Sequence, residues 1–491
     1  MYFKEEIYKH FQKNNNNQQL EYLDNLTCRL ANLVEEEKAN YYDRLSRMLN
    51  DPKTSSKKYW SLLKTLMNGK KTPLIPPLLI NNQFISDFKV KSNLFNNYFS
   101  DQCTPIANES QIPNEINHYT DKNLYNVRFS LDDICNIIRN LDINKAHGYD
   151  NISVRIIKIF GNSICKPLEI IFRCCLEVGI FPAIWKKANI VPIHKKNERN
   201  LLKNYRPVSL LPVCSKIFER LIFNSLYNYL HINKLLHPNQ SGFKPGDSCT
   251  NQLISISHLI FSSFDHPNSH EVRGVFLDMS KAFDKVWHEG LLYKLKCFGI
   301  SGYLFNILKS FLSNRLQRVT LNGQNSEWRV IRAGVSHMYI PGLLFFLLYV
   351  NDLPQNLIST VKLFADDVSL FSVVKNDVSL SANDLNHDLA MISNWSLQWK
   401  MSFNPDPSKQ ANEVLFSRKR NANPHPNLFF NGTKVNRVVS QKHLGITLDE
   451  KLSFNEHVSI NLFKARKGVG VLKKLFYVIP RDSLNHLCAL I

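Results

Sequence analysis

Two adjacent carboxylates, Asp366 and Asp367, interrupt the otherwise apolar stretch "KLFADDVSLFS" of this 491-residue chain. The apolar residues on either side predict two short strands that meet at the acid pair. Neighbouring negative charges repel by roughly 1 to 4 kcal/mol at 4 Å, depending on the dielectric. We therefore expect a positive partner for the pair, unless it forms a solvated surface turn, where Asp is common.

A second acid pair, Asp132 and Asp133, serves as an internal control. Ser130 lies three residues before Asp133, which is the capping-box spacing, and apolar residues follow at helical intervals. Acids in a first helical turn are stabilised by the helix dipole. This pair is therefore interpreted as structural, whereas no helix is predicted to begin at Asp366 and Asp367.

A third acid, Asp278, follows Val272–Leu277, which predicts a buried strand, and the chain becomes helical beyond Ser280. An acid at a strand end is a common metal ligand, although an N-cap or loop acid would look the same. Asp278 and Asp366 are 88 residues apart, which suits two strands of one sheet with helices between them. Side by side, the acids would offer the oxygen ligands that Mg²⁺ prefers, and two such ions would serve in-line phosphoryl transfer.

The composition limits the partners and the compartment. Lys and Arg number 61 against 41 acids, and the net charge of +20 points to a polyanionic partner. Ten cysteines show neither zinc-ligand nor disulfide spacing, which favours a reducing compartment and no zinc. The most apolar run, Leu343–Val350, is too short to span a bilayer, and the first residues are too polar for a signal peptide. We expect an intracellular protein, nuclear and cytoplasmic, without a membrane partner.

Several regions can be outlined before any resemblance is considered. The Asn run Asn14–Asn17 and the Pro-rich segment Thr72–Asn82 read as linker or boundary. From about residue 130 the pattern is α+β, with a strand at Ala188–Lys196 and an amphipathic helix at Lys216–Leu230.

The acid motifs "FADD" and "FLDMSKAFDKVWH" resemble the palm motifs of reverse transcriptases from non-LTR, LINE-type and jockey-like retrotransposons. Four further segments resemble the fingers region of that family: Asn144–Ser153, Trp185–Lys196, Asn204–Glu219 and Asn239–Leu253. Two later segments resemble its palm and primer grip: Trp399–Gln410 and His443–Phe454. The resemblance runs in family order from roughly 140 to 480.

The resemblance implies an α+β right-hand polymerase with fingers and a ferredoxin-like palm. We expect an N-terminal extension or linker, helical or coil, at 1–125, fingers at 126–265, a palm with the catalytic acids and primer grip at 266–450, and the start of a truncated thumb at 451–491. We also expect the family's upstream endonuclease domain to be absent.

The implied activity is RNA-directed DNA polymerisation, with an RNA template, a DNA primer, deoxynucleoside triphosphates and two Mg²⁺ ions, Mn²⁺ being an alternative. By family analogy Asp278 and Asp366 are ligands of both ions and Asp367 participates more loosely. Lys409 matches a lysine thought to protonate the pyrophosphate leaving group, although an exposed loop lysine is the alternative.

Nucleotide contacts are also implied by the resemblance. Lys195 and Arg206 match residues that hold the triphosphate, a task suited to a point charge and to a bidentate guanidinium. Lys195 could otherwise belong to a solvated lysine run. Phe283, five residues after Asp278, matches a steric gate against the ribose 2′-OH, but it could equally be a core aromatic.

The remaining expected contacts are to the nucleic acid. Phosphate contacts give affinity without sequence choice and are strongly salt-dependent. The residues expected here are the basic residues of the fingers and the primer-grip turn: Lys186, Lys187, Lys196, Lys203, Leu444 and Gly445.

One loop departs from the family pattern. Ser336–Tyr339 replaces the family's Pro-Gln-Gly-Ser, and the segment is one residue shorter. Met338 would intrude where a glycine permits close backbone approach. Two function classes therefore remain: an active polymerase, or a catalytically impaired, decayed remnant that only binds nucleic acid. An intron-encoded or retron enzyme is disfavoured because no maturase segment is recognisable.

Overall fold

The computed structural model describes residues 17–51, 75–104, 111–266, 271–335, 340–375, 377–406, 410–419 and 424–475. The chain divides into two compact units, one formed by residues 75–454 and the other by residues 1–74 with 455–491. The second unit contributes helices α2 (Asn17–Asn50) and α15 (Asn455–Leu475). None of the helices in these described ranges is long and apolar enough to cross a membrane.

The unit of residues 75–454 contains a five-stranded sheet, called the β5 sheet, with strand order β14–β11–β5–β10–β9. Its strands are β5 (Glu271–Asp278), β9 (Thr360–Phe364), β10 (Asp367–Val374), β11 (Ala411–Ser417) and β14 (Asn436–Arg437). Neighbouring strands are antiparallel except β11 and β14. The central strand β5 is buried at every residue except its last, Asp278. The predicted buried strand that ends at Asp278 is therefore confirmed.

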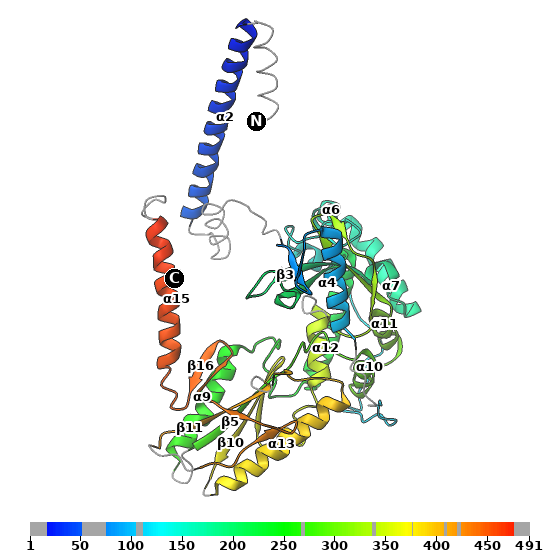
Figure 1. Cartoon of the computed structure of the whole chain (residues 1–491). Helices are drawn as coiled ribbons and strands as arrows, with labels where there is room; N and C mark the ends of the chain where they lie inside the picture. The colour runs from blue at the N-terminus through cyan, green and yellow to red at the C-terminus, as the bar shows by residue number, and fades with distance from the viewer. Residues whose placement is uncertain are drawn as a thin grey trace. The chain divides into compact units, whose positions relative to one another are not determined.

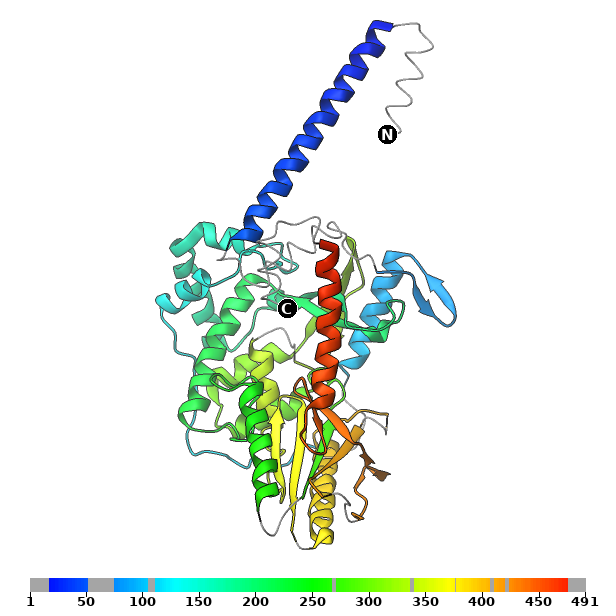
Figure 2. The same cartoon turned by 90° about the vertical axis from the view of Figure 1, so that its left-hand side faces the viewer.

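Side chains alternate along each strand, so the buried strand β5 has apolar side chains on both faces of the β5 sheet. A helix covers each face. Helix α9 (Cys249–Asp265) packs through Ile256 and Ile260 on the face that carries Val272. Helix α13 (Val378–Gln398) packs through Leu385 on the face that carries Val275. Figure 2 shows the strands between the two helices, with α9 in green and α13 in yellow.

A second sheet, called the β3 sheet, has the order β4–β3–β6–β7, with β8 paired to β6. Its strands are β3 (Lys187–His194), β4 (Tyr205–Leu210), β6 (Arg315–Leu321), β7 (Gln324–Asn325) and β8 (Arg329–Ile331). Helix α4 (Phe88–Gln102) covers one face, with Phe95 and Phe99 packed against Ile190 and Val319. The sheet thus joins strands from the ranges expected to be fingers and palm, and helix α4 from the expected N-terminal extension packs against it.

The remaining helices of this unit are α5 (Leu131–Arg139), α6 (Val154–Phe160), α7 (Cys165–Val178), α8 (Val213–Ile232), α10 (His288–Cys297), α11 (Gly302–Leu312) and α12 (Ile340–Val350) (Figure 1). Three short 3₁₀ helices are η1 (Gly161–Ile164), η2 (Ala183–Lys186) and η3 (Leu202–Asn204). Three two-stranded hairpins are formed by β1 (Leu78–Ile80) and β2 (Gln83–Ile85), β12 (Phe429–Phe430) and β13 (Thr433–Lys434), and β15 (Ser440–His443) and β16 (Ile446–Asp449).

Two local predictions have clear outcomes. The capping box is confirmed, since the Ser130 hydroxyl accepts from the Asp133 amide while the Asp133 carboxylate accepts from the Ser130 amide. The helix expected just beyond Ser280 is wrong in its start, because α10 begins only at His288. Turns fill the interval, and Lys281 there has a left-handed backbone with φ 50°, which a right-handed helix cannot contain.

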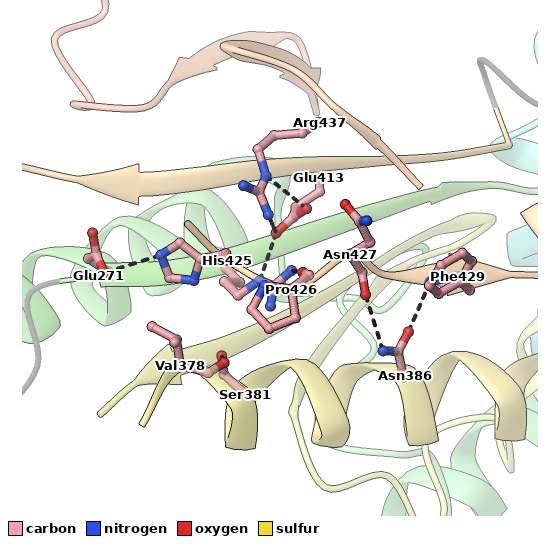
Figure 3. Close-up of polar contacts among 11 residues, drawn as sticks. Glu271, Val378, Ser381, Asn386, Glu413, His425, Pro426, Asn427, Phe429 and Arg437 are labelled. Carbon is pink, nitrogen blue, oxygen red and sulfur yellow. Dashed lines mark hydrogen bonds and ion pairs between the residues drawn. The ribbon is translucent and has the colours of Figure 1, made fainter. Parts of the chain in front are cut away.

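The first half of β5 is tied to β11 by buried ion pairs. The Arg273 side chain is fully buried, and its Nε donates to the Glu413 carboxylate at 2.7 Å. A terminal Arg273 nitrogen donates to the Pro426 carbonyl at 2.8 Å. Arg437 on β14 adds a second cation to Glu413, at 3.1 Å (Figure 3).

Glu271, the first residue of β5, is neutralised in the same way. Its carboxylate accepts from the Ser417 hydroxyl at 2.9 Å and lies 3.3 Å from the His425 ring and 3.4 Å from the Lys419 ammonium. Figure 3 shows the contact between Glu271 and His425. Carboxylates at this end of β5 therefore have cationic partners within the protein.

Candidate active site

The opposite end of β5 brings acids together. Asp367, the first residue of β10, lies directly opposite Asp278 in the antiparallel register. Asp366 stands in the turn between β9, which ends at Phe364, and β10. The predicted hairpin is confirmed, as is the prediction that its acids and Asp278 belong to one sheet.

Burial and neighbouring negative charge both act on Asp367. Desolvation by the surrounding protein, together with the charges of Asp366 and Asp278, raises the pKa of Asp367 to about 6. The side chain nevertheless reaches solvent, so a ligand could approach it. A bound cation would relieve the repulsion, because an opposite charge favours the ionised carboxylate.

The turn that carries Asp366 is held by a neighbouring loop. Ala365 has a left-handed backbone with φ 56°, a conformation that costs an L-residue on the order of 1 to 2 kcal/mol. The side-chain oxygen of the buried Gln240 accepts from the amides of both Ala365 (3.0 Å) and Gly242 (2.9 Å). A side chain at Gly242 would lie 2.3 Å from the Ala365 nitrogen, so only glycine permits this contact. The conformation before Asp366 is therefore stabilised from outside the hairpin.

Asn404 orients Asp278. Its backbone amide donates to the Asp278 carbonyl at 2.8 Å, and its side-chain amide donates to one Asp278 carboxylate oxygen at 2.7 Å. The Asn404 side-chain oxygen accepts from the Asp406 amide at 3.1 Å, which fixes the orientation of the side chain. Asp278 is thus held by a neutral amide donor and not by a cation at this contact.

Two predicted nucleotide contacts lie near these acids. Lys195 follows β3, and its backbone amide donates to the Asn204 carbonyl at 2.8 Å. Burial and the neighbouring cations Arg206 and Lys196 lower the pKa of Lys195, while Asp278 and Asp366 act in the opposite direction. The Lys195 ammonium is therefore within electrostatic range of both acids and of the exposed Arg206.

Phe283 lies in an aromatic group beside the acids. Its ring stacks on Phe346 with the centroids 4.2 Å apart and meets the Phe243 ring edge-on at 6.0 Å. Only 3% of Phe283 is exposed. This burial is what the core-aromatic interpretation expects, and only a small edge of the ring is left to contact a ligand.

The residues expected to contact nucleic acid fall into three groups: lysines that reach solvent, one buried lysine, and a hairpin turn. Lys187, Lys196 and Lys203 reach solvent. Lys186 is 8% exposed, and its ammonium donates to the Ser310 hydroxyl at 3.2 Å, so the structure directs it into the protein.

Leu444 and Gly445 form the two-residue turn between β15 and β16. Both have positive φ, 46° and 92°, as a tight hairpin turn requires. Near the base of this hairpin, the Gln441 side chain accepts from Asn412, whose strand partner is Phe276, two residues before Asp278. The turn therefore belongs to a hairpin anchored close to the acids.

Two predicted elements lie outside the described residues: Lys409 and the loop Ser336–Tyr339. Within the described part of the chain, no three His, Cys, Asp or Glu side chains are grouped closely enough to hold a metal ion by themselves. The donor set that the sheet does supply consists of carboxylate oxygens beside a cation-rich strand end, which fits Mg²⁺ with water and phosphate oxygens as further ligands.

Sequence reasoning missed the residues that support the acids. Gln240 and Gly242 stand in the segment Asn239–Leu253, and Asn404 stands in Trp399–Gln410, both of which resemble family segments. Nothing in their spacing indicates which acid each one contacts, since those contacts exist only after the chain has folded.

Comparison with known proteins places these observations in a family. The profile of the reverse transcriptase (RNA-dependent DNA polymerase) family matches residues 193–448. The RNA-directed DNA polymerase from mobile element jockey of Drosophila melanogaster is 31% identical over 368 residues, which cover 73% of this chain and 39% of that protein. The probable RNA-directed DNA polymerase from transposon BS of the same fly is 28% identical over 479 residues, covering 94% of this chain and 51% of the relative.

A third relative, the probable RNA-directed DNA polymerase from transposon X-element of Drosophila melanogaster, is 30% identical over 72% of this chain and 38% of its own length. The chain thus spans about half the length, or less, of the curated relatives that it matches.

Proposed function

We propose that this chain, which belongs to the reverse transcriptase family and is related to the polymerases of non-LTR retrotransposons, extends a DNA primer along an RNA template. The observation that carries the proposal is the register of β5 and β10. It sets Asp278 opposite Asp367 at the one exposed residue of an otherwise buried strand.

We assign the metal ligands to Asp278 and Asp366, with Asp367 as a weaker participant. Two Mg²⁺ ions, or Mn²⁺, would supply Lewis-acid activation of the primer hydroxyl and charge neutralisation at the pyrophosphate leaving group. The raised pKa of Asp367 supports this assignment, because after desolvation its next causes are the charges of Asp366 and Asp278, which lie close enough to share a cation. Asn404 keeps the Asp278 carboxylate in a fixed orientation.

Lys195 and Arg206 are assigned to the triphosphate of the incoming deoxynucleotide. A guanidinium can donate two parallel hydrogen bonds to phosphate oxygens, while an ammonium acts as a point charge. Their position at the end of β3 and the start of β4 supports this role, since the Lys195 ammonium is within range of Asp278 and Asp366. Phe283 is proposed to limit space at the ribose, and Lys409 to donate a proton to pyrophosphate.

We assign the β5 sheet with α13 to the palm, β3 and β4 to the fingers, and the chain from residue 451 to the start of the thumb. Beyond the ranges expected from the sequence, we add α9 to the palm because it packs on the β5 sheet, and α4, β6, β7 and β8 to the fingers because they pack on or pair within the β3 sheet. Lys187, Lys196 and Lys203 would contact the backbone of the bound nucleic acid, and the Leu444–Gly445 turn the primer. Lys186 is left out of this set because its ammonium already contacts Ser310.

A second candidate function is a nucleic-acid-binding protein with impaired catalysis. Ser336–Tyr339 favours it, because four residues differ from the family pattern and one residue is missing. Catalysis requires the primer hydroxyl and the α-phosphorus near attack distance, and a misplacement of about 1 Å can cost about a hundredfold.

One experiment separates the two functions. The parent chain and a repaired variant, with Pro-Gln-Gly-Ser at 336–339 and the missing residue restored, are compared for primer extension on one primed RNA template with Mg²⁺. We expect both to bind the primed template and the repaired chain to extend it faster by orders of magnitude. Brisk extension by the parent would contradict impairment, and no extension by either chain would contradict the polymerase assignment.

A further inference from the structure

Four side chains outside the acid site form an aromatic–cation cluster: Tyr149, Lys187, Arg318 and Trp328. The rings of Tyr149 and Trp328 meet edge-to-face, with centroids 5.7 Å apart and planes at 84°. The Lys187 ammonium lies 5.6 Å from the first ring and 5.7 Å from the second. The Arg318 guanidinium lies 4.7 Å from the Trp328 ring, and its Nε donates to the Asn189 side chain at 2.8 Å.

The β3 sheet fixes the position of the two cations. Asn189 on β3 lies opposite Arg318 on β6, and Lys187 lies two residues earlier on β3, so these side chains share one face of the sheet. Helix α4 covers the other face. All four members of the cluster are partly exposed. The cluster is therefore on the open face of the β3 sheet, where a ligand can reach it.

The tyrosine is held by a close backbone contact. Gly148, immediately before Tyr149, lies so near the start of α8 that an added Cβ would be 2.3 Å from the Pro212 nitrogen. Asp150 adjoins the cluster and raises the pKa of Tyr149 while Arg318 lowers it, both after the larger effect of burial. Glu327, which precedes Trp328 in the chain, is paired with Lys89 at 2.9 Å, so the two cations of the cluster outweigh Asp150.

We propose that the aromatic–cation cluster binds the unpaired template RNA, with bases stacked on Trp328 and Tyr149 and phosphates on Lys187 and Arg318. Flat aromatic rings beside Lys and Arg are the chemistry that holds single-stranded nucleic acid without sequence preference. Identifying the bound RNA as the template rests on the proposed polymerase function, but the binding itself requires neither metal nor nucleotide.

The open face of the β3 sheet links the cluster to the acid site. Ile193 lies four residues after Asn189 on β3, so both side chains point to the same face, about 13 Å apart. Arg206 lies opposite Ile193 on β4. A strand that leaves the nucleotide position at Arg206 can therefore follow this face to the cluster.

The test measures binding of two primed RNAs, one blunt and one with an unpaired 5′ template extension of about 12 nucleotides. Metal and nucleotide are left out, so absence of polymerase activity does not affect the result. The variants are Trp328→Leu and Tyr149→Leu, which keep apolar volume but remove the ring. We expect each to weaken binding of the extended RNA between about fivefold and a hundredfold and to leave blunt-duplex binding unchanged.

Salt dependence separates stacking from charge. Lys187→Met and Arg318→Met should each reduce the slope of log K against log salt by about 0.7, whereas the ring variants should leave the slope unchanged. Trp328→Phe should retain most of the affinity, since a ring remains. Matched controls are Tyr303→Leu and Lys309→Met on α11, where Tyr303 is 52% exposed, and these should change nothing.

Three results would overturn the proposal. The first is that both ring variants bind the extended RNA as tightly as the parent does. The second is an equal loss for blunt and extended RNA, which would assign the cluster to the duplex or to folding. The third is a parent that does not discriminate between the two RNAs. Retained discrimination in a chain that cannot extend a primer would support the cluster and contradict only the polymerase function.

Discussion

Strand β5 carries an acid at each end, and the two acids have different partners. At its first residue, the Glu271 carboxylate lies within 3.4 Å of an imidazole and an ammonium. At its last residue, Asp278 accepts from a neutral amide and faces another acid, Asp367. The first end is built to neutralise charge within the protein, and the second end accumulates it.

This difference indicates where a ligand has to act. A buried carboxylate is tolerated when it is paired and hydrogen-bonded, because desolvation otherwise disfavours the charge. Glu413, between Arg273 and Arg437, satisfies that condition. At the other end, desolvation and the charges of Asp366 and Asp278 together raise the pKa of Asp367 to about 6. Accumulated negative charge at an exposed strand end is consistent with a cation that comes from solution.

The largest expected effect is on catalysis. Asp278→Asn or Asp366→Asn should lower primer extension by at least about a thousandfold in a chain that extends measurably, because several kcal/mol of charge stabilisation are lost. Binding of primed RNA should persist. Asp132→Asn, in the capping-box helix, is the matched control and should extend like the parent. Parent-like extension by Asp278→Asn would show that the acid at the last residue of β5 has no catalytic role.

At the other end of β5, the expected effect is on stability. Arg273→Met leaves Glu413 buried with one cation fewer and should lower the free energy of unfolding by about 3 to 5 kcal/mol, as measured by urea denaturation. The double variant Arg273→Met/Glu413→Leu should recover part of this loss, since the buried carboxylate is gone and the cation that loses it, Arg437, has a side chain that is 36% exposed. Extension per folded molecule should not change. A specific loss of extension at full stability would contradict the structural role.

A smaller effect is expected from the residue that orients Asp278. Asn404→Ala should raise the Mg²⁺ concentration for half-maximal activity about 10- to 100-fold, as loss of partners behind metal ligands generally does. Asn386→Ala is the control, because the Asn386 side chain bonds two backbone groups, those of Asn427 and Phe429, instead of an acid (Figure 3). Equal effects of the two substitutions would argue against a positioning role.

The smallest effect concerns pH and stability in the metal-free chain. Because folding raises the pKa of Asp367 to about 6 from an ordinary value near 3.9, this group favours the folded state below about pH 4, and that contribution is lost as pH rises through about 6. Asp367→Asn should therefore gain Tm relative to the parent between pH 4 and 7, with the difference largest at the upper end. A Tm difference that is constant over this range would show that the acid is not strained by its neighbours.

The sequence predicted local structure well where a pattern repeats within a few residues. The capping box at Ser130, the buried strand before Asp278 and the hairpin at Asp366 all depend on short spacings. The start of α10 was missed because a left-handed Lys281 has no clear signature in the residue types around it.

Long-range packing could not be predicted in the same way. Helix α4 fell within an expected extension, although Phe95 and Phe99 bury themselves against β3 and β6. Its hydrophobic face is narrow, and Lys91, Ser92 and Asn96 are buried as well. The pattern of apolar and polar residues therefore does not identify α4 as a core helix. The contacts of Gln240 with Ala365 and of Asn404 with Asp278 join residues 125 and 126 positions apart. A single sequence carries no signal for such pairs.

The measurement that tests the central claim most directly is Mn²⁺ binding followed by electron paramagnetic resonance, with primed RNA and a nucleotide bound to the protein. It depends on the acids and not on the rate of catalysis, so the loop at 336–339 cannot hide the answer. We predict that the parent binds Mn²⁺ beyond the RNA and nucleotide background, that Asp278→Asn and Asp366→Asn lose this binding, and that Asp132→Asn keeps it. Equal Mn²⁺ binding by the parent and both acid variants would contradict the account.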